Sequence, residues 1–323
     1  MRNYAIRRAL INIPVIWFVA TLVFFATNVL PGDFVAERIA IQNPISDDPA
    51  ARLLQLETIR EELGLNDPVH IRYVKYLGDT IRGDFGTSYE TRRPALEGFR
   101  KGLPYTLQLS LMTLFFGVIT ALPVGIISAV RQDTWVDYIL RVFSIGALAA
   151  PNFWVATMVL LYVVRWDLWT VPLTASPLLW EDPLASMRLF IIPAVVGGVA
   201  SGATTMRLLR SQMLEVLRQD YIRTAWAKGL RERVVITRHA LKNAFIPVVT
   251  VLGLTIAGLI SGNVVFEFLF SINGVGNRIL RSIRSRDVPV VQAFVLVLAT
   301  FVVFVNLAID LLYGMLDPRI RYS

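Results

Sequence analysis

The sequence predicts an all-α polytopic membrane protein with six transmembrane helices and a small helical extracytoplasmic insert between the first two. Three observations predict this fold class. Hydrophobic residues make up 55% of the 323 residues, and the mean hydropathy of +0.56 is too high for a soluble chain with one core. The apolar residues gather in six runs of at least about 20 residues, the length needed to cross a hydrocarbon layer of about 30 Å. Charged and turn-forming residues separate the runs.

The net charge of +8 fits the orientation of such a protein better than it fits nucleic-acid binding. Loops that remain in the cytoplasm carry an excess of Lys and Arg. Half of the 32 Lys and Arg residues fall at the two termini, after the second run, and between 207 and 242. With six spans these segments share one side of the cell membrane, so both termini are expected in the cytoplasm. No nucleic-acid partner is expected.

The first apolar run extends from Ile11 to Leu30 and follows three arginines. A cleaved signal peptide is the alternative to a membrane span here. The run is longer than the apolar part of a typical signal peptide, and no small-x-small cleavage site follows it. The sequence therefore favours an uncleaved first span, surrounded by membrane lipid.

Residues 31–101 are polar and rich in Pro and Gly, so they cannot lie in lipid. Two helical stripes cover 48–64 and 67–83, and each begins with Asp-Pro and ends at Gly. We expect two short helices in an ordered extracytoplasmic insert. A cap that contacts no partner is the alternative function of this insert.

Five further runs complete the predicted spans. Pro123 and Pro151 lie inside two of the runs, where they should kink the helices, and packed neighbours can tolerate such kinks in a membrane. The runs are Leu103 to Val130, Tyr138 to Val164, Leu189 to Leu209, Phe245 to Phe266 and Val290 to Leu312.

Small residues recur four positions apart in the fourth and fifth runs. Gly198 with Gly202, and Gly258 with Gly262, are the pairs. Small residues let helix backbones approach closely. Close packing is the favoured interpretation, and lining of a translocation path is the alternative.

A basic segment joins the fourth and fifth runs. Leu214, Leu217, Tyr221 and Ala225 recur at helical spacing, and the pattern stops at Gly229, which favours a left-handed helix end. A second basic and apolar stretch follows. The sequence thus predicts a helix, a sharp turn and another helix, which protrude from the membrane and insert into a groove on a partner.

The residues of a catalytic or cofactor site are missing from the sequence. The spacing Gly197 to Thr204 matches a phosphate-binding loop in its glycines, but Ala203 stands in the place of the required Lys and no strand precedes it. His70 and His239 are the two histidines and there is no Cys, so a metal site within the chain is not expected. If this membrane protein uses ATP to move a solute, the ATP must therefore be bound by a partner.

Three stretches and the end of the chain carry a family resemblance. Residues 223–230 read RTAWAKGL and 238–248 read RHALKNAFIPV; residues 62–89 read ELGLNDPVHIRYVKYLGDTIRGDFGTSY; residues 267–292 read EFLFSINGVGNRILRSIRSRDVPVVQ. With the terminal LDPRIRY, they resemble the permease subunits of ABC importers of the dipeptide/oligopeptide/nickel type. The chain is most similar to the B-type membrane subunit of these importers.

This resemblance implies a type I ABC importer permease fold. The chain would pair with a homologous second permease, rest on two cytoplasmic ATPase subunits that bind ATP and Mg, and receive substrate from an extracytoplasmic solute-binding protein. It would be a transport subunit, not an enzyme, and would itself hold no cofactor. Peptides are the expected substrates, and nickel, glutathione and oligosaccharides are the alternatives within the family.

The resemblance also implies residue roles. Within a coupling loop at 210–243, bulk at Thr224, Ala225 or Gly229 should block docking or destroy the turn. Asn273 stands where the family usually has proline, in a structural turn before the sixth span that is expected at Glu267, Gly274 and Gly276. The residues expected to couple to the ATPase are Tyr221, Arg223, Thr224, Ala225, Lys228, Gly229, Leu230, His239 and Leu241.

The expected organisation has four parts: a cytoplasmic N-terminus with the first span (1–30), the insert (31–101), a five-helix permease core (102–316) and a cytoplasmic C-terminus (317–323). Two other function classes remain open. A secondary transporter or channel would show intramembrane carboxylates or an interrupted repeat, and neither is evident. A membrane scaffold that recruits a cytoplasmic partner would show no substrate-dependent ATP hydrolysis.

Overall fold

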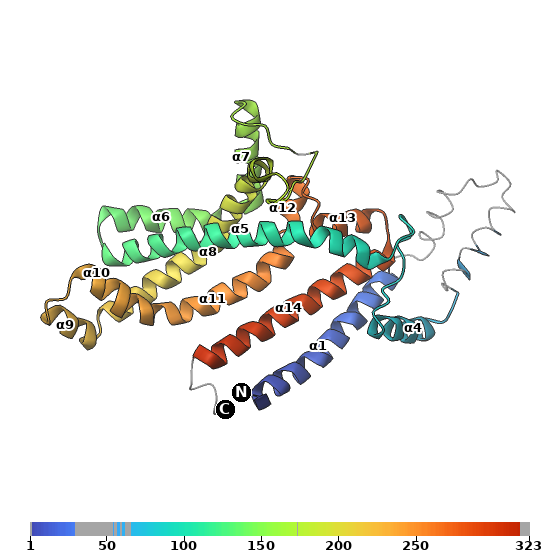
Figure 1. Ribbon diagram of the computed structural model, residues 1–323, viewed down its shortest axis with the longest axis horizontal. Helices are drawn as coiled ribbons and strands as arrows, with labels where there is room; N and C mark the ends of the chain where they lie inside the picture. Colours follow the sequence, from blue (N-terminus) through green and yellow to red (C-terminus); the bar gives the residue numbers. More distant parts are fainter. Residues whose placement is uncertain are drawn as a thin grey trace. The chain divides into compact units, whose positions relative to one another are not determined.

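The computed structural model describes residues 2–29, 54, 57–58, 60–61, 66–172 and 174–316, and the regular elements among them are helices (Figure 1). The chain divides into two compact units. Unit 1 comprises Met1–Leu103 and Asn273–Ser323, and unit 2 comprises Pro104–Ile272.

Four helical segments are long and apolar enough to cross a membrane. They coincide with most or all of the first, second, fourth and sixth predicted spans, so these four are confirmed as helices of spanning length. Two bent pairs raise the number of candidate spans among the described residues to six if each pair is one span. The four long segments are Leu10–Thr27, Ala95–Val130, Pro183–Leu217 and Val288–Ile309.

The predicted third span is not one helix. It consists of α6 (Trp135–Ala149) and α7 (Asn152–Arg165), which are bent by 99° at the break between them. The break falls at Pro151, which has no N–H to donate and excludes the residue before it from the helical region. Ala150 accordingly has φ −81° and ψ 133°. By contrast, Pro123 lies inside the unbroken helix α5 (Ala95–Val130).

The predicted fifth span is also bent. The segments Glu232–Phe245 and Pro247–Ile256 meet at 58°, again beside a proline. They belong to a run of helices formed by α10 (Glu232–Val234), the π-helix η1 (Val235–Ala240) and α11 (Leu241–Gly262). The short helix α12 (Val264–Leu269) follows.

In unit 1, α1 (Arg2–Val29) packs along α14 (Val288–Leu316). The Gln292 side-chain amide donates a hydrogen bond to the Thr27 hydroxyl at 2.6 Å. Helix α4 (Val69–Ile81) contacts α1, where the Tyr73 and Thr21 hydroxyls lie 2.7 Å apart.

One predicted helix of the insert is confirmed. Helix α4 ends before Gly83, whose φ of 81° is left-handed as expected for a glycine stop. Its start differs from the prediction, because Pro68 is the N-cap residue and the Asp67 carboxylate instead pairs with the Lys75 amine at 2.6 Å. The other predicted helix, at 48–64, lies outside the described residues except for 54, 57–58 and 60–61, which are helical.

The two glycines of the predicted turn are divided between a bend and a helix. Gly274 is extended, with φ −74° and ψ 177°, and Gly276 is buried inside α13 (Val275–Arg284). Gly274 has no left-handed conformation that would require glycine. Its neighbourhood is crowded, however, since a Cβ on Gly102 would lie 3.1 Å from the Gly274 carbonyl carbon. Glu267, expected in the same turn, is a buried residue of α12 that accepts a 2.6 Å hydrogen bond from Thr106.

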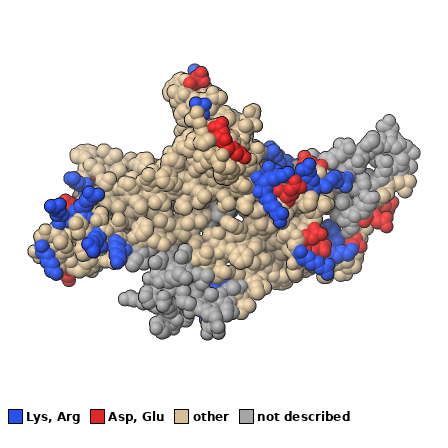
Figure 2. All heavy atoms as spheres, viewed as in Figure 1, with Lys and Arg blue, Asp and Glu red and all other residues tan. Residues whose placement is uncertain are grey.

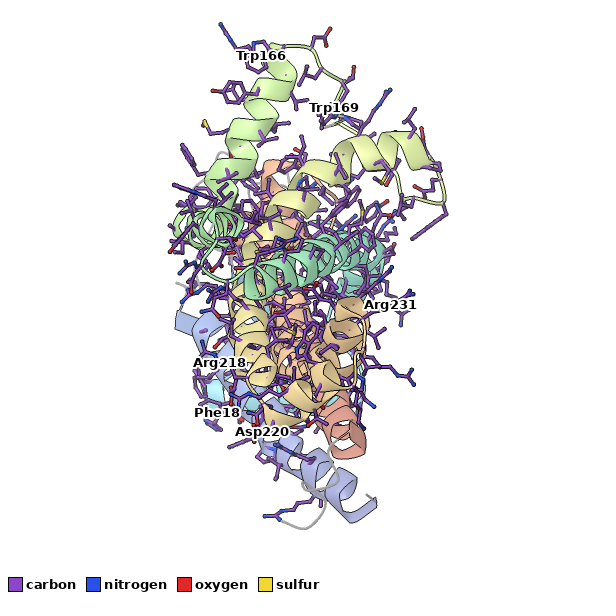
Figure 3. All side chains as sticks on the ribbon, turned by 90° about the vertical axis from the view of Figure 1, so that its left-hand side faces the viewer. Phe18, Trp166, Trp169, Arg218, Asp220 and Arg231 are labelled. Carbon is purple, nitrogen blue, oxygen red and sulfur yellow. The ribbon has the colours of Figure 1, made fainter. Side chains whose placement is uncertain are left out.

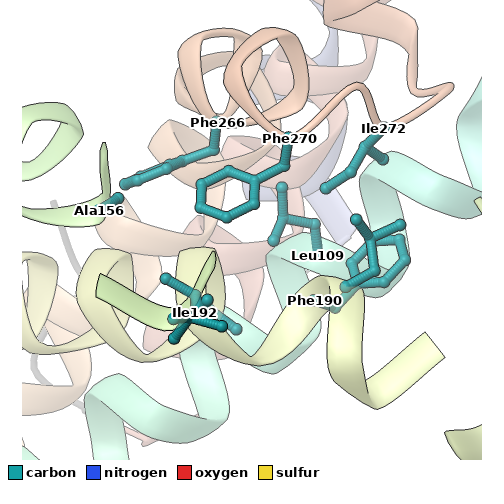
Figure 4. Packing of buried hydrophobic residues seen from close by; sticks show 10 residues of the cluster. Leu109, Ala156, Phe190, Ile192, Phe266, Phe270 and Ile272 are labelled. Carbon is teal, nitrogen blue, oxygen red and sulfur yellow. The ribbon is translucent and has the colours of Figure 1, made fainter. Parts of the chain in front are cut away.

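The core of unit 2 surrounds α8 (Pro183–Leu217), which packs against α6, α7 and α11. Figure 4 shows Phe190 from α8 beside Leu109 from α5 and the Phe266 and Phe270 rings. Phe190, Leu109 and Phe270 are completely buried. This cluster fixes the end of unit 2 at which α12 meets α7 and α8.

Glycines let α5 and α8 pack backbone against backbone. A Cβ on Gly198 would lie 2.7 Å from the Gly117 nitrogen and 2.7 Å from the Thr113 oxygen, and one on Gly202 would lie 2.8 Å from the Gly117 oxygen. The packing interpretation is confirmed for this pair. For Gly258 an added Cβ would meet no atom of the described residues within 4 Å, so the packing interpretation stays a prediction there. The surroundings of Gly262 lie outside the described part.

We predict that Gly198→Ala destabilises the protein, because its methyl group would overlap two backbone atoms of α5. Overpacking of this kind costs about 1–3 kcal/mol. Gly258→Ala is the matched control, since it makes the same change in an open position of a helix and gains helix propensity. The thermal unfolding of each variant, purified in detergent, measures the difference. Equal melting temperatures would contradict the close contact.

Candidate functional site

The basic segment after α8 forms a short helix of its own. Helix α8 ends at Leu217, and α9 (Asp220–Ala227) begins after an extended Gln219 with φ −73° and ψ 149°. The single helix predicted from Leu214 to Ala225 is therefore interrupted. We call residues 218–231 the α9 segment.

The α9 segment ends in the left-handed turn that the sequence predicts. Gly229 has φ 70°. Its N–H donates to the Trp226 carbonyl at 2.9 Å, and the Leu230 N–H donates to the Ala225 carbonyl at 3.4 Å. This pair of hydrogen bonds is the Schellman motif, which satisfies carbonyls at a helix end and depends on a residue that tolerates positive φ.

The inner face of α9 is anchored in the core of unit 2. Ile222 and Ala225 are buried against Leu209 and Met213 of α8 and Val235 of η1. The Ala225 methyl group faces inward and is not part of the exposed face. A larger side chain there would disturb the packing of α9 on α8, and its effect on docking stays a prediction.

The outer face of α9 exposes a set of aromatic, apolar and basic side chains. Tyr221 is 43% exposed and Trp226 is 44% exposed. Figure 2 shows Lys and Arg gathered over α9 and α10. The exposed residues of this face are Tyr221, Arg223, Thr224, Trp226, Lys228, Gly229 and Leu230.

The returning helix holds the α9 segment in place. Asn243 of α11 donates hydrogen bonds to the Tyr221 hydroxyl at 2.8 Å and to the His239 carbonyl at 3.4 Å. His239 is half-buried in η1, and Leu241 packs against the same core as Ile222. Thus His239 and Leu241 support the α9 segment and do not belong to its exposed face. The π-helix η1 is a rare element that often marks a functional position.

Sequence reasoning missed two kinds of residue at this site. Trp226 occupies a position at which the motif specifies no residue type. The signal that could have found it is an aromatic side chain between basic residues, which is typical of an interface. Ile222 and Asn243 lie between the motif positions and hold the segment from beneath.

A buried ion pair fixes α8 two turns before it ends. The Arg210 guanidinium donates to both carboxylate oxygens of Asp137 in α6, at 2.9 and 2.8 Å. Asp137 also accepts from the Ser128 hydroxyl of α5 and from the Asp133 N–H, and its side chain is completely buried. These bonds join three helices near the α9 segment. The signal in the sequence that could have indicated this ion pair is Asp137 itself, an acidic residue directly before the third apolar run.

A cavity of about 650 Å³ lies among α5, α6, α7, α8 and α11. Its wall includes the Ala150-Pro151 break, Gly258, and neutral polar residues such as Thr113, Ser201 and Asn263. None of the described residues that line it is charged. Across the part of the chain that the structure describes, no group of three His, Asp or Glu side chains could hold a metal ion.

The aromatic and basic ends of unit 2 are separate. In Figure 3, Trp166 and Trp169 lie toward one end of the unit, at and after the end of α7. Arg218, Asp220 and Arg231 of the α9 segment lie away from them. Basic residues at one end of a helix bundle and aromatic residues at the other are typical of a membrane protein.

We predict that Arg210→Met destabilises the protein, because it leaves the buried Asp137 carboxylate without its bidentate partner. Removing one member of a buried pair costs about 3–5 kcal/mol, and the lower end is expected here because an Arg141 nitrogen remains 3.4 Å from Asp137. The exposed Arg207 of α8 provides the matched control, Arg207→Met, with a change within about 0.5 kcal/mol. Denaturant unfolding in detergent measures both. Equal stabilities would show that the pair is unimportant.

Known relatives align with the whole chain, and a family model matches its larger part. Residues 121–322 match the family model of the "Binding-protein-dependent transport system inner membrane component". The chain is 35% identical over 341 residues to the dipeptide transport system permease protein DppB of Alkalihalophilus pseudofirmus. It is 38% identical over 325 residues to the oligopeptide transport system permease protein AppB of Bacillus subtilis, and 35% identical over 323 residues to the glutathione transport system permease protein GsiC of Salmonella paratyphi A. Each alignment covers 100% of both chains. The chain therefore belongs to the family of inner membrane permease subunits of binding-protein-dependent ABC transporters.

Proposed function

We propose that this chain forms half of the translocation pathway of an ATP-driven importer for di- or oligopeptides. Three full-length relatives are named for dipeptide, oligopeptide and glutathione transport, and all three solutes contain peptide bonds. The observation that carries the proposal is the α9 segment, which presents an exposed face on a rigid base. Such a face suits a cytoplasmic subunit that supplies energy.

The exposed face of the α9 segment is proposed to dock into a groove on an ATPase subunit. Tyr221, Trp226 and Leu230 supply apolar area, and Arg223 and Lys228 flank them. Aromatic residues and arginine are the side chains that carry most of the binding energy at protein interfaces. ATP and Mg would be bound by the two ATPase subunits and not by this chain.

Coupling is proposed to pass from α9 to α8 through packed side chains. Ile222 and Ala225 contact Leu209 and Met213, so a displacement of α9 would displace the end of α8. Further along, Gly197 and Ser201 of α8 line the cavity. ATP binding can shift the transporter between two states only if the ATPase contacts α9 differently in each.

The remaining partners and the orientation follow the same proposal. A homologous second permease would complete the pathway on the open side of the cavity, and a solute-binding protein would deliver substrate from outside. Both termini would lie in the cytoplasm with the basic α9 segment, because retained loops are rich in Lys and Arg. The four-part organisation at 1–30, 31–101, 102–316 and 317–323 is part of this proposal.

Glutathione is the second candidate substrate, favoured by the relative named for it. Nickel and oligosaccharide uptake have no comparable support among the relatives described above. Uptake of labelled dipeptide by cells with and without the chain, in competition with unlabelled glutathione, maltose or Ni²⁺, separates these substrates.

We predict that the affinity-tagged chain, extracted in mild detergent from its native membrane, retains a second permease and ATPase subunits. Mass spectrometry identifies them, and a co-purified solute-binding protein would give the route to the substrate. A second full-length membrane protein purified in parallel controls for nonspecific capture. Recovery of the chain alone in several detergents would contradict the proposal.

We predict that Gly229→Val uncouples ATP hydrolysis from uptake. A β-branched residue at φ 70° is strained by about 1–2 kcal/mol, which would break the Schellman turn. No atom of the described residues lies within 4 Å of a Cβ at this position, so the turn is altered without a clash. Gly229→Asn is the matched control, because Asn tolerates the left-handed region. In proteoliposomes, the amount of peptide taken up per ATP hydrolysed should fall for the Gly229→Val variant and remain unchanged for the Gly229→Asn variant. Wild-type uptake by the Val variant would refute the role of this turn.

A further inference from the structure

An apolar groove of about 360 Å³ lies between α1 and α14, both of which belong to unit 1. The two helices pack along one another, with the beginning of α1 beside the end of α14 (Figure 1). Leu10, Ile13 and Phe304 of the groove are 57%, 61% and 60% exposed, so the groove is open. Of the described residues that line it, all but one are apolar, namely Leu10, Ile13, Ile16, Val303, Phe304 and Leu307.

The remaining lining residue is Asn12 of α1, which is half-buried. Its side-chain amide can donate and accept hydrogen bonds, but no hydrogen bond among the described residues involves this amide. Thr21 and Thr27 of α1, by contrast, donate to backbone carbonyls one turn earlier. A partly buried amide among apolar side chains is unfavourable without a hydrogen-bond partner. The Asn12 amide is therefore available to a ligand in the groove.

An exposed arginine lies at the same end of the groove. The membrane-spanning part of α1 begins at Leu10, and Arg7 lies one turn before it on the neighbouring surface of the helix. Arg8 lies one turn before Asn12, but it already has an interaction within the chain. Arg7 is exposed, and its long side chain brings a positive charge to this end of the groove.

The order of these residues along α1 matches the order of the chemical groups in a phospholipid. A helix rises about 1.5 Å per residue, which places Asn12 about 7.5 Å and Ile16 about 13.5 Å deeper than Arg7. The polar layer of each leaflet is about 5–7.5 Å thick, from the difference between a bilayer of about 40–45 Å and its hydrocarbon core of about 30 Å. Arg7 therefore lies at the level of the phosphate, Asn12 at the level of the ester groups and Ile16 among the acyl chains.

The size of the groove excludes a helix as its occupant. One turn of helix with its side chains, about 10–12 Å across and about 5.4 Å long, fills more than about 400 Å³. The groove provides about 360 Å³, which is less than a single turn requires. A flexible chain of methylene groups can follow such a narrow apolar space, and the burial of each methylene group is favourable.

We propose that the groove between α1 and α14 binds an acyl chain of an anionic phospholipid, whose ester oxygen accepts a hydrogen bond from Asn12 and whose phosphate pairs with Arg7. The site shares no residue with the cavity of unit 2 or with the α9 segment. The hydrogen bond from Gln292 to Thr27 joins α1 to α14 near their other ends. Bound lipid would hold together the ends that this bond does not reach.

Photoactivatable lipids test the proposal on the tagged chain purified with its bound subunits. The complex is reconstituted into phosphatidylcholine vesicles that contain a small fraction of one probe. The two probes have the same acyl chains, with a diazirine in the part nearest the ester group, and differ only in carrying a phosphatidylglycerol or a phosphatidylcholine headgroup. Mass spectrometry of the labelled peptides measures the yield at residues 10–16 and 303–307.

The phosphatidylglycerol probe should label these residues about fivefold more than the phosphatidylcholine probe, because one arginine near the membrane surface favours an anionic lipid by about that factor. Arg7→Gln should bring the ratio close to one, and so should salt of about 1 M with the wild-type chain. Arg131→Gln is the matched control, since Arg131 is an exposed residue at the end of another span and does not line the groove. That variant should keep the ratio of about fivefold.

Asn12 and Asn306 provide a second matched pair. Asn12→Leu should lower the yield of both probes by about two- to tenfold, because both contain the ester group that bonds to Asn12. Asn306→Leu makes the same change at an exposed position of α14 outside the groove and should have no effect. Ile13→Trp should lower the labelling of 303–307 by filling the groove, whereas Val15→Trp, at an exposed position of α1 outside the groove, should not.

Equal labelling by the two probes in the wild-type chain, or equal yields in Asn12→Leu and Asn306→Leu, would overturn the proposal. A photoreactive amino acid in place of Ile13 identifies any other occupant of the groove. Capture of phospholipid is the expected result. Capture of a second membrane subunit, or of residues 317–323, in place of lipid would show that protein covers the groove and would also overturn the proposal. Labelling requires neither ATP nor uptake, so its outcome does not depend on the proposed function.

Discussion

The close approach of α5 and α8 at Gly117, Gly198 and Gly202 is the contact on which the rest of unit 2 depends. Apolar helices in lipid gain little from hiding apolar surface from one another, so their association relies on close packing and hydrogen bonds. This contact fixes α8, and α8 connects two functional regions. Its middle lines the cavity, and its end leads directly into the α9 segment.

Polar groups occur within the apolar helices where they have a structural or functional reason to be there. The Asp137 and Arg210 charges satisfy one another and lock α6 to α8 before the α9 segment begins. The Thr113 hydroxyl has no hydrogen-bond partner among the described residues, and the α6–α7 break interrupts the hydrogen bonds of the helix backbone. Both features lie in the cavity wall. Membership of the permease family excludes the secondary transporter, channel and scaffold classes, and the chain is a multi-pass inner membrane transport subunit and not an enzyme.

The sequence predicted the features that depend on composition and local conformation. Four spans follow from the length of their apolar runs, and the turn at Gly229 follows from its tolerance of positive φ. The sequence predicted a kink at both Pro123 and Pro151. It could not show that the helix breaks by 99° at Pro151 but continues through Pro123 in α5, because the outcome depends on the neighbours of each helix. Likewise, motif position could not show that Ala225 faces the core while Trp226 faces outward. The partners of Asp137 and the surroundings of Thr113 depend on tertiary contacts and lay beyond the sequence.

The most direct test of the account is a photocrosslink from the exposed face of the α9 segment. A photoreactive amino acid replaces Arg223, whose side chain is 75% exposed, and a second variant carries it at Trp166, beyond the end of α7. Both are irradiated in native membranes, and mass spectrometry identifies the crosslinked proteins. The account predicts a crosslink from position 223 to an ATP-binding subunit and none from position 166. A crosslink to that subunit from 166, or its absence from 223 in an assembled complex, would contradict the account.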